Sequence, residues 1–147
     1  MIGGVESPAD SLEELTGELV MLAGRLVRQV RHATPDAPAL RLLVLLHDHG
    51  PTTIGQIAAL DGVSQPSVTQ AVHRLTDRGW LARSTHPDDA RATLVSLTDD
   101  GLEALREIRT HNAALMRERL LAADDEAPDL DDVAAAVAVL RTLTEGH

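Results

Sequence analysis

The chain has 147 residues, a formal net charge of −10 and a hydrophobic content of 44%. It contains no Cys, which excludes disulfides, thiolate metal sites and cysteine redox sensors. It has no Phe or Tyr and a single Trp, so Leu, Val and Ala must form the core, and this composition favours helices.

The sequence before residue 50 predicts two helices, which precede most of the candidate binding residues. Ser11-Leu12-Glu13-Glu14 has the form of a capping box, which predicts the start of a helix that ends near His32. This helix carries one narrow apolar stripe, formed by Leu12, Leu15, Leu19, Leu22 and Leu26. A second helix is predicted over residues 39–49, and its LRLLVLL run indicates that it is buried.

Two further helices follow, separated by a tight turn. Thr53 and Gln56 form a second capping-box pair at the start of a short helix, which ends at the turn Asp61-Gly62. Ser64 is the predicted N-cap of the next helix, which has Pro66 in its first turn and ends near Arg78.

After Gly79 the pattern changes from helical to strand-like. The runs WLARST and ATLVSL, joined by HPDDAR, predict a β-hairpin. Thr98 then caps a long helix that reaches about Ala122, and a last helix carries Leu130, Val133, Val137 and Leu140. The predicted fold is mainly α with a small β-hairpin wing, which is a winged helix-turn-helix.

The helix after Ser64 has an apolar side and a polar side. Val68, Ala71, Val72 and Leu75 share the inward side, whereas Gln70, His73, Arg74 and Asp77 point outward. Gln pairs with adenine and Arg with guanine in the major groove, so this helix has the residues of a DNA-reading helix. The alternative is an ordinary solvated helix face.

The distribution of charge favours DNA reading. Residues 64–93 hold four Arg and three Asp, a net charge of +1, which leaves −11 for the rest of the chain. Arg91, on the returning side of the hairpin, is positioned to enter the minor groove, and Asp89 could orient its guanidinium. The alternative is an exposed turn salt bridge of little energetic value.

These stretches resemble the MarR (multiple antibiotic resistance regulator) family of transcription factors. The motif SQPSVTQAVHRLTDRGWL, the Asp-x-Arg of the wing and Leu97-Thr98-x-x-Gly101 carry the resemblance, which extends from about residue 10 to residue 145. It implies a homodimer whose terminal helices intertwine and whose wings bind a pseudo-palindromic operator in double-stranded DNA. The DNA contacts that it implies are Ser64, Gln65, Pro66, Ser67, Thr69, Gln70, His73, Arg74, Asp89 and Arg91. Ala90 stands where the family often has a further Arg, which implies a weaker hold by the wing tip.

The resemblance also implies an effector, a small aromatic or phenolic acid that binds between the dimerisation helices and the winged region. Its candidate contacts are Arg25, Arg28, His32, Arg41 and His47, each of which has an alternative as an ordinary surface residue. We expect no cofactor, and no metal site because His47 and His49 do not share a helical face. The chain has neither a Gly-rich phosphate loop nor a Gly-x-Ser-x-Gly elbow, and we expect no enzyme activity.

The sequence therefore predicts a homodimeric, sequence-specific transcriptional regulator, a repressor that a small molecule releases from DNA. One domain spans residues 1–147, with the winged helix-turn-helix at 39–98 and dimerisation helices at 10–34 and 99–145. No apolar run is long enough for a membrane span and the N-terminus does not resemble a signal peptide, so we expect a cytoplasmic protein. The alternative function is a winged-helix protein-interaction module without DNA binding, which the net charge of −10 and Ala90 favour.

Overall fold

The computed structural model describes residues 8–34, 37–87, 89, 91–123 and 127–145. Its elements are α1 (Pro8–Ala33), α2 (Ala37–His49), β1 (Thr52–Thr53), α3 (Ile54–Asp61), α4 (Gln65–Asp77), β2 (Leu81–Thr85), β3 (Thr93–Leu97), α5 (Asp99–Leu121) and α6 (Leu130–Glu145). Two compact units are present, Met1–Ile108 and Arg109–His147, and α5 continues from the first into the second. The predicted fold class, mainly helical with a small winged sheet, is confirmed.

The core of the first unit is built on α2. Its buried residues, Ala39, Leu42, Leu43 and Leu46, recur at the spacing of one helix face, as the apolar run predicts. The facing residues come from three other helices and from the sheet; they are Ile57, Ala58, Val68, Val72, Leu75, Leu81, Val95 and Leu105. Of the predicted inward side of α4, Val68, Val72 and Leu75 are buried and Ala71 is partly buried, and the other side is left for solvent or a ligand.

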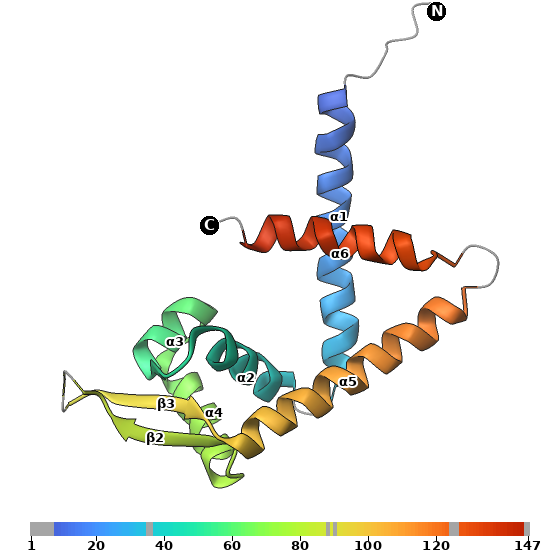
Figure 1. Ribbon diagram of the computed structural model, residues 1–147. Helices are drawn as coiled ribbons and strands as arrows, with labels where there is room; N and C mark the ends of the chain where they lie inside the picture. Colours follow the sequence, from blue (N-terminus) through green and yellow to red (C-terminus); the bar gives the residue numbers. More distant parts are fainter. Residues whose placement is uncertain (1–7, 35–36, 88, 90, 124–126, 146–147) are drawn as a thin grey trace, which may run out of the picture. The chain divides into compact units, whose positions relative to one another are not determined.

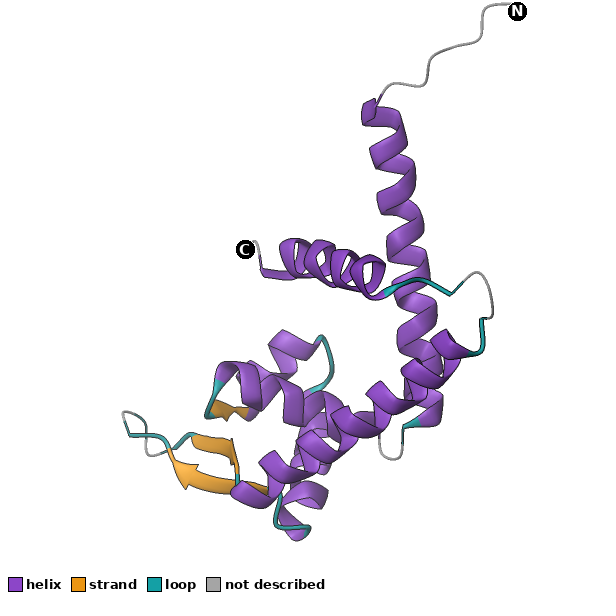
Figure 2. Ribbon diagram, turned by 45° about the vertical axis from the view of Figure 1, so that its right-hand side comes forward, coloured by secondary structure: helices purple, strands orange, loops and turns teal. Residues whose placement is uncertain are grey.

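A three-stranded antiparallel sheet, in the order β1-β3-β2, forms the wing and anchors it. Residues 81–85 of β2 pair with residues 93–97 of β3 in the predicted hairpin. Figure 1 shows this hairpin extending from the cluster of α2, α3 and α4, and Figure 2 shows the short β1 beside it. The sequence did not predict β1, in which Thr52 pairs with Val95 and Thr53 with Leu94. This third strand holds the base of the wing against the start of α3.

Three predicted helix caps are confirmed within the helix-turn-helix. Thr53 and Gln56 form the reciprocal capping box of α3, with the Gln56 N–H donating to Thr53 Oγ1 at 3.3 Å and the Thr53 N–H donating to Gln56 Oε1 at 3.0 Å. Ser64 caps α4 by accepting from the Ser67 N–H. Gly62 takes a left-handed conformation, with φ of 64°, in the turn between the two helices. These local signals determine where both helices of the helix-turn-helix begin.

Replacing Thr53 with Ala removes the hydroxyl from this capping box. We expect the free energy of unfolding to fall by about 1 kcal/mol, because an N–H at the start of α3 loses its acceptor. Chemical denaturation measures this change. Thr53→Ser keeps the hydroxyl and is the matched control, which should remain close to the wild type. Equal losses in both variants would show that the Thr53 methyl group, and not the cap, carries the effect.

A compact joint connects the end of α4 to the start of α5. Thr98 Oγ1 donates to the Gly79 carbonyl at 2.6 Å, and the Thr98 N–H donates to the Trp80 carbonyl at 3.1 Å. The Gly101 N–H donates to Thr98 Oγ1 at 3.0 Å, so Thr98 is also the predicted cap of α5. Gly101 is buried against the Trp80 backbone, where a Cβ would lie 2.9 Å from the Trp80 carbonyl carbon and closer still to its oxygen. Only glycine allows the two segments to approach this closely.

The helix α1 begins earlier than the sequence indicates. It starts at Pro8, a residue type that suits a first helical turn because the N–H that proline lacks would have no helical partner there. Ser11 therefore lies inside the helix, and the prediction that Ser11 caps it was wrong. Leu12 and Leu15 are each 63% exposed, and Leu22 and Leu26 are also exposed. The predicted leucine stripe is thus largely uncovered within the chain.

The second unit contains the end of α5 and the helix α6. None of the described residues of α6 is buried, and Leu130 is 82% exposed. Val137, Val139, Leu140 and Leu143 are exposed as well. In the part of the chain that the structure describes, no helix has the length and apolar character that a membrane span requires.

Candidate nucleic-acid interface

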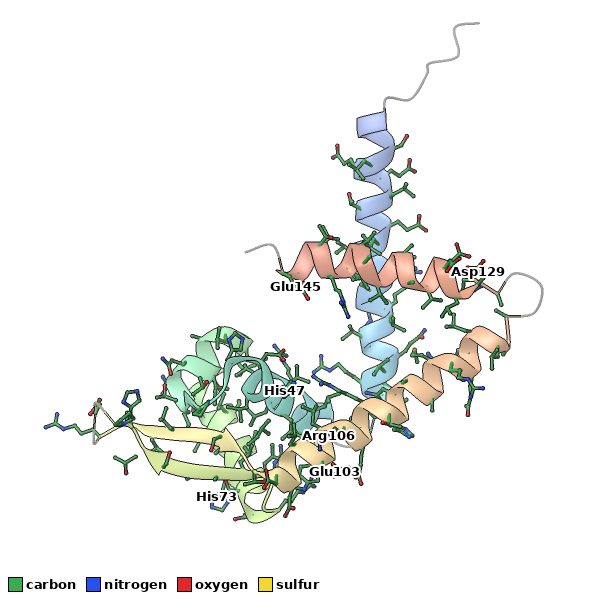
Figure 3. The ribbon with its side chains drawn as sticks, viewed as in Figure 1. His47, His73, Glu103, Arg106, Asp129 and Glu145 are labelled. Atoms are coloured by element: carbon green, nitrogen blue, oxygen red, sulfur yellow. The ribbon has the colours of Figure 1, made fainter. Side chains whose placement is uncertain are left out.

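The outward side chains of α4 lie together on one open surface. Ser67, Thr69, Gln70, His73 and Arg74 line this surface, and all five are exposed. Figure 3 shows His73 projecting from α4 away from the rest of the winged region. Ser64, Gln65 and Pro66 are exposed at the start of the same helix. Every DNA contact that the sequence implies on this helix is therefore accessible, and the first two turns hold most of them.

Hydrogen bonds within α4 separate its polar side chains into two groups. Thr69 Oγ1 donates to the Gln65 carbonyl at 2.9 Å, and the Ser64 and Ser67 hydroxyls lie 2.8 Å apart in a hydrogen bond. These three hydroxyl groups already form hydrogen bonds within the helix and its cap. Among the described residues, by contrast, the side chains of Gln70 and Arg74 have no hydrogen-bond or ion-pair partner. Both can therefore present their full donor and acceptor sets to a ligand.

His73 has a hydrogen-bond partner within the last turn of this helix. His73 Nδ1 lies 2.9 Å from Asp77 Oδ2, and both side chains are about two-thirds exposed. Arg78, just beyond the helix, stacks over the Trp80 ring at 5.1 Å from the ring centre. Arg74, one residue after His73, is therefore the cation of α4 that points outward without a carboxylate partner among the described residues.

Asp89 stabilises the turn of the wing through hydrogen bonds to the main chain. Asp89 Oδ1 accepts from the Arg91 backbone N–H at 2.9 Å, and the Asp89 carbonyl accepts from the Ala92 N–H at 2.9 Å. The predicted pairing of Asp89 with the Arg91 guanidinium is absent from the described residues, because the carboxylate binds the main chain two residues ahead. Arg91 is exposed at the hairpin, and Ala90 lies outside the described residues.

The candidate effector residues are only partly brought together. Arg41, on α2, borders an apolar cavity of about 530 Å³ between α1 and α2. Arg25, Arg28 and His32 lie exposed on α1, and His47 lies exposed on α2 (Figure 3). Arg31, which the sequence did not single out, also borders this cavity. Its position after Leu26, Val27 and Val30 on one side of α1 could have revealed it. Within the described residues, no cluster of three or more His, Asp or Glu could hold a metal ion.

Comparison with known proteins gives a consistent result. The model of the MarR family matches residues 36–93. An HTH-type transcriptional regulator of Mycobacterium leprae is 32% identical over 125 residues, which cover 82% of this chain and 87% of the relative. The match extends well beyond the helix-turn-helix into the flanking helices.

Solved structures share the fold. The apo form of MarR from E. coli superimposes with a TM-score of 0.66 and 18% identity, over 98% of each chain. BpsR of Bordetella bronchiseptica, whose DNA binding is regulated by 6-hydroxynicotinic acid, superimposes with a TM-score of 0.59 and 24% identity. This match covers 89% of the present chain and 98% of BpsR.

Proposed function

The chain belongs to the MarR family of transcriptional regulators, and we propose that it is a homodimeric repressor that reads an operator through α4 and leaves it when a small acid binds. The relatives that it matches are transcriptional regulators, and this chain is likewise a regulator and not an enzyme. Its site of action is DNA in the cytoplasm. Residues 39–98 would bind DNA, and residues 10–34 and 99–145 would form the dimer within one domain.

One observation carries the proposal for DNA reading. On an exposed face of α4, Gln70 and Arg74 have side chains without partners among the described residues, one turn apart. Gln and Arg are the residues that recognise adenine and guanine by paired hydrogen bonds. The remaining contacts, Ser64, Gln65, Pro66, Ser67, Thr69 and His73, would position the helix, and Asp89 and Arg91 would place the wing against the backbone.

The exposed apolar faces support the homodimer. The leucines of α1 and the Val and Leu residues of α6 form apolar surfaces that a monomer would leave in water. A two-fold dimer buries the same face of both copies. Two reading helices about one helical turn apart would then enter successive major grooves of a pseudo-palindrome.

The relative from Bordetella bronchiseptica supports a ligand-released repressor, because its DNA binding is regulated by a small aromatic acid. For this chain we propose a small aromatic or phenolic acid, with Arg25, Arg28, His32, Arg41 and His47 as candidate contacts. Release requires that the acid bind the conformation without DNA more tightly than the conformation on DNA.

Alanine substitutions in α4 and in the wing test the reading surface. We expect Gln70→Ala and Arg74→Ala each to weaken operator binding by about 1–3 kcal/mol per half-site and to relax the preference for one base pair. Arg91→Ala should weaken binding to all sequences, because it loses a contact that does not depend on the base. Footprinting on the DNA upstream of the gene, with mutated operator positions, measures both effects.

Arg106→Ala is the matched control for these variants. Arg106 is exposed on α5, where its Nη1 pairs with Glu103 at 2.9 Å (Figure 3). Its removal should leave the footprint unchanged. Unchanged binding by all three test variants would contradict the proposed reading surface.

Salt dependence separates the proposal from the alternative of a protein-interaction module. Binding through phosphates should weaken steeply with salt, with a slope of about −0.9 per neutralised phosphate in a log–log plot. Absence of DNA binding at low salt would favour the interaction module, which the net charge of −10 also suits.

A further inference from the structure

Arg41 occupies a position between the first helix and the helix-turn-helix. Its side chain extends from α2 and borders two cavities, the one of about 530 Å³ between α1 and α2 and another of about 170 Å³ beneath α4. Arg31, from the end of α1, borders both cavities as well. The two guanidinium groups therefore lie where α1 and α2 meet the base of the reading helix.

Arg41 also holds the turn that precedes α4. Its Nε forms an ion pair with Asp61 Oδ1, and its Nη2 donates to the Asp61 carbonyl at 2.6 Å. Asp61 is the last residue of α3, where the helix dipole disfavours a carboxylate that has no cation nearby. Arg41 thus neutralises Asp61 and satisfies a carbonyl at the helix end. These two bonds attach the Asp61–Ser64 turn to α2.

The charges around the two cavities do not balance. Arg31 and Arg41 are both cationic, whereas among the described residues Asp61 is the single carboxylate that borders either cavity. Within the described part of the chain, Arg31 has no ion-pair partner. The remaining walls of the larger cavity are aliphatic; they are Leu26, Val27, Val30, Leu40 and Val44. A small monocarboxylate with an apolar body matches this combination of one excess positive charge and an apolar wall.

We propose that Asp61 and the carboxylate of such a ligand compete for Arg41, and that this competition transmits ligand binding to α4. The inference rests on the proposed function and assigns its regulation to one ion pair. A carboxylate that binds Arg31 and Arg41 from the α1–α2 cavity lies beside the carboxylate of Asp61. Two carboxylates that share one guanidinium repel each other, so ligand binding weakens the bonds that hold the turn before α4.

Thermodynamic linkage makes this proposal testable without the natural ligand. If ligand and Asp61 compete, then removing the Asp61 charge must strengthen carboxylate binding. The probe is hexanoate, and hexanamide is its uncharged counterpart with the same apolar body. We expect Asp61→Asn to bind hexanoate about two- to fivefold more tightly than the wild type, the range that a partly exposed ion pair supports.

Two further variants and one ligand control complete the test. Arg41→Gln should bind hexanoate about tenfold more weakly, because it loses a charge-assisted hydrogen bond. Asp48→Asn removes an exposed carboxylate from α2 outside both cavities and should match the wild type. Hexanamide should bind weakly to all of them. Calorimetry gives the affinities, and the ¹⁵N resonances of the arginine Nε groups show whether Arg31 and Arg41 respond.

Two outcomes would overturn the competition. One is equal hexanoate affinity in the wild type and Asp61→Asn, and the other is the absence of saturable hexanoate binding to the wild type. The gain expected of Asp61→Asn cannot arise from misfolding, and thermal melting of Arg41→Gln shows whether that variant is folded. Operator binding is measured separately. If the protein fails to bind DNA, then the proposed function fails, while the hexanoate titrations still decide whether Asp61 and a carboxylate compete.

Discussion

Replacing Gly101 with Ala is expected to lower the free energy of unfolding by about 3 kcal/mol, a large loss for a single methyl group. The methyl group would lie 2.9 Å from the carbonyl carbon of Trp80, and the neighbouring atoms are backbone that cannot rotate away. To accommodate it, the start of α5 must separate from the Gly79–Trp80 segment. The bonds from Thr98 to Gly79 and Trp80 would then be lost together.

Gly17→Ala is the control for this substitution. Gly17 lies within α1, where an added Cβ would contact nothing within 4 Å. The same chemical change should there stabilise the helix by up to about 1 kcal/mol, because Ala has a higher helix propensity than Gly. Chemical denaturation at one protein concentration measures both variants. If Gly101→Ala is as stable as the wild type, then the joint between α4 and α5 is looser than the structure indicates.

The double variant Leu15→Arg/Leu22→Arg is expected to convert the dimer into monomers and to weaken operator binding at least about 100-fold. Both leucines are exposed on one side of α1, and in a dimer they would meet the partner subunit. Two charges placed there would be buried without partners. A monomer holds one half-site only, so it loses the gain in affinity that linked binding sites give. Light scattering measures the mass, and a footprint measures the affinity.

The matched control for the dimer is Gly17→Arg/Val20→Arg. It adds the same charge on the opposite side of α1, at two exposed positions. We expect this control to keep both the dimer mass and the footprint. If both double variants dissociate equally, then charge on α1, rather than the leucine stripe, explains the result. A wild-type protein with the mass of one chain would contradict the dimer itself.

The parts of the fold that the sequence predicts are those governed by local chemistry. Ser64 and Thr53 cap their helices through bonds to residues three positions ahead, so the motif contains both partners. The buried side of α4 follows from the spacing of Val68, Val72 and Leu75. The resemblance to the MarR family also depends on this compact motif, and the match to the family and to its relatives confirms it.

The parts that the sequence does not predict depend on contacts between distant segments. The strand β1 has two residues, too few for a periodic pattern, and exists because β3 pairs with it. Arg41 and Asp61 are separated by 20 positions and lie on different helices, so only the fold brings them together. Ser11 matches a capping box, yet the helix continues past it to Pro8. A local motif permits a helix start but does not require one.

The joint at Thr98 and Trp80 has a mechanical consequence. Because the end of α4 is bonded to the start of α5, a rotation of this part of α5 turns α4 with it. The 13 residues of α4 extend about 20 Å from the joint, at 1.5 Å per residue. A rotation of about 10° at the joint would therefore move the opposite end by about 3.5 Å, as follows from that length. Ser64, Gln65 and Ser67 lie at that end, and such a displacement exceeds the tolerance of a hydrogen bond to DNA. The contacts proposed at the start of α4 would therefore move most, whereas Arg74, in the last turn of α4, lies beside the joint and would move least.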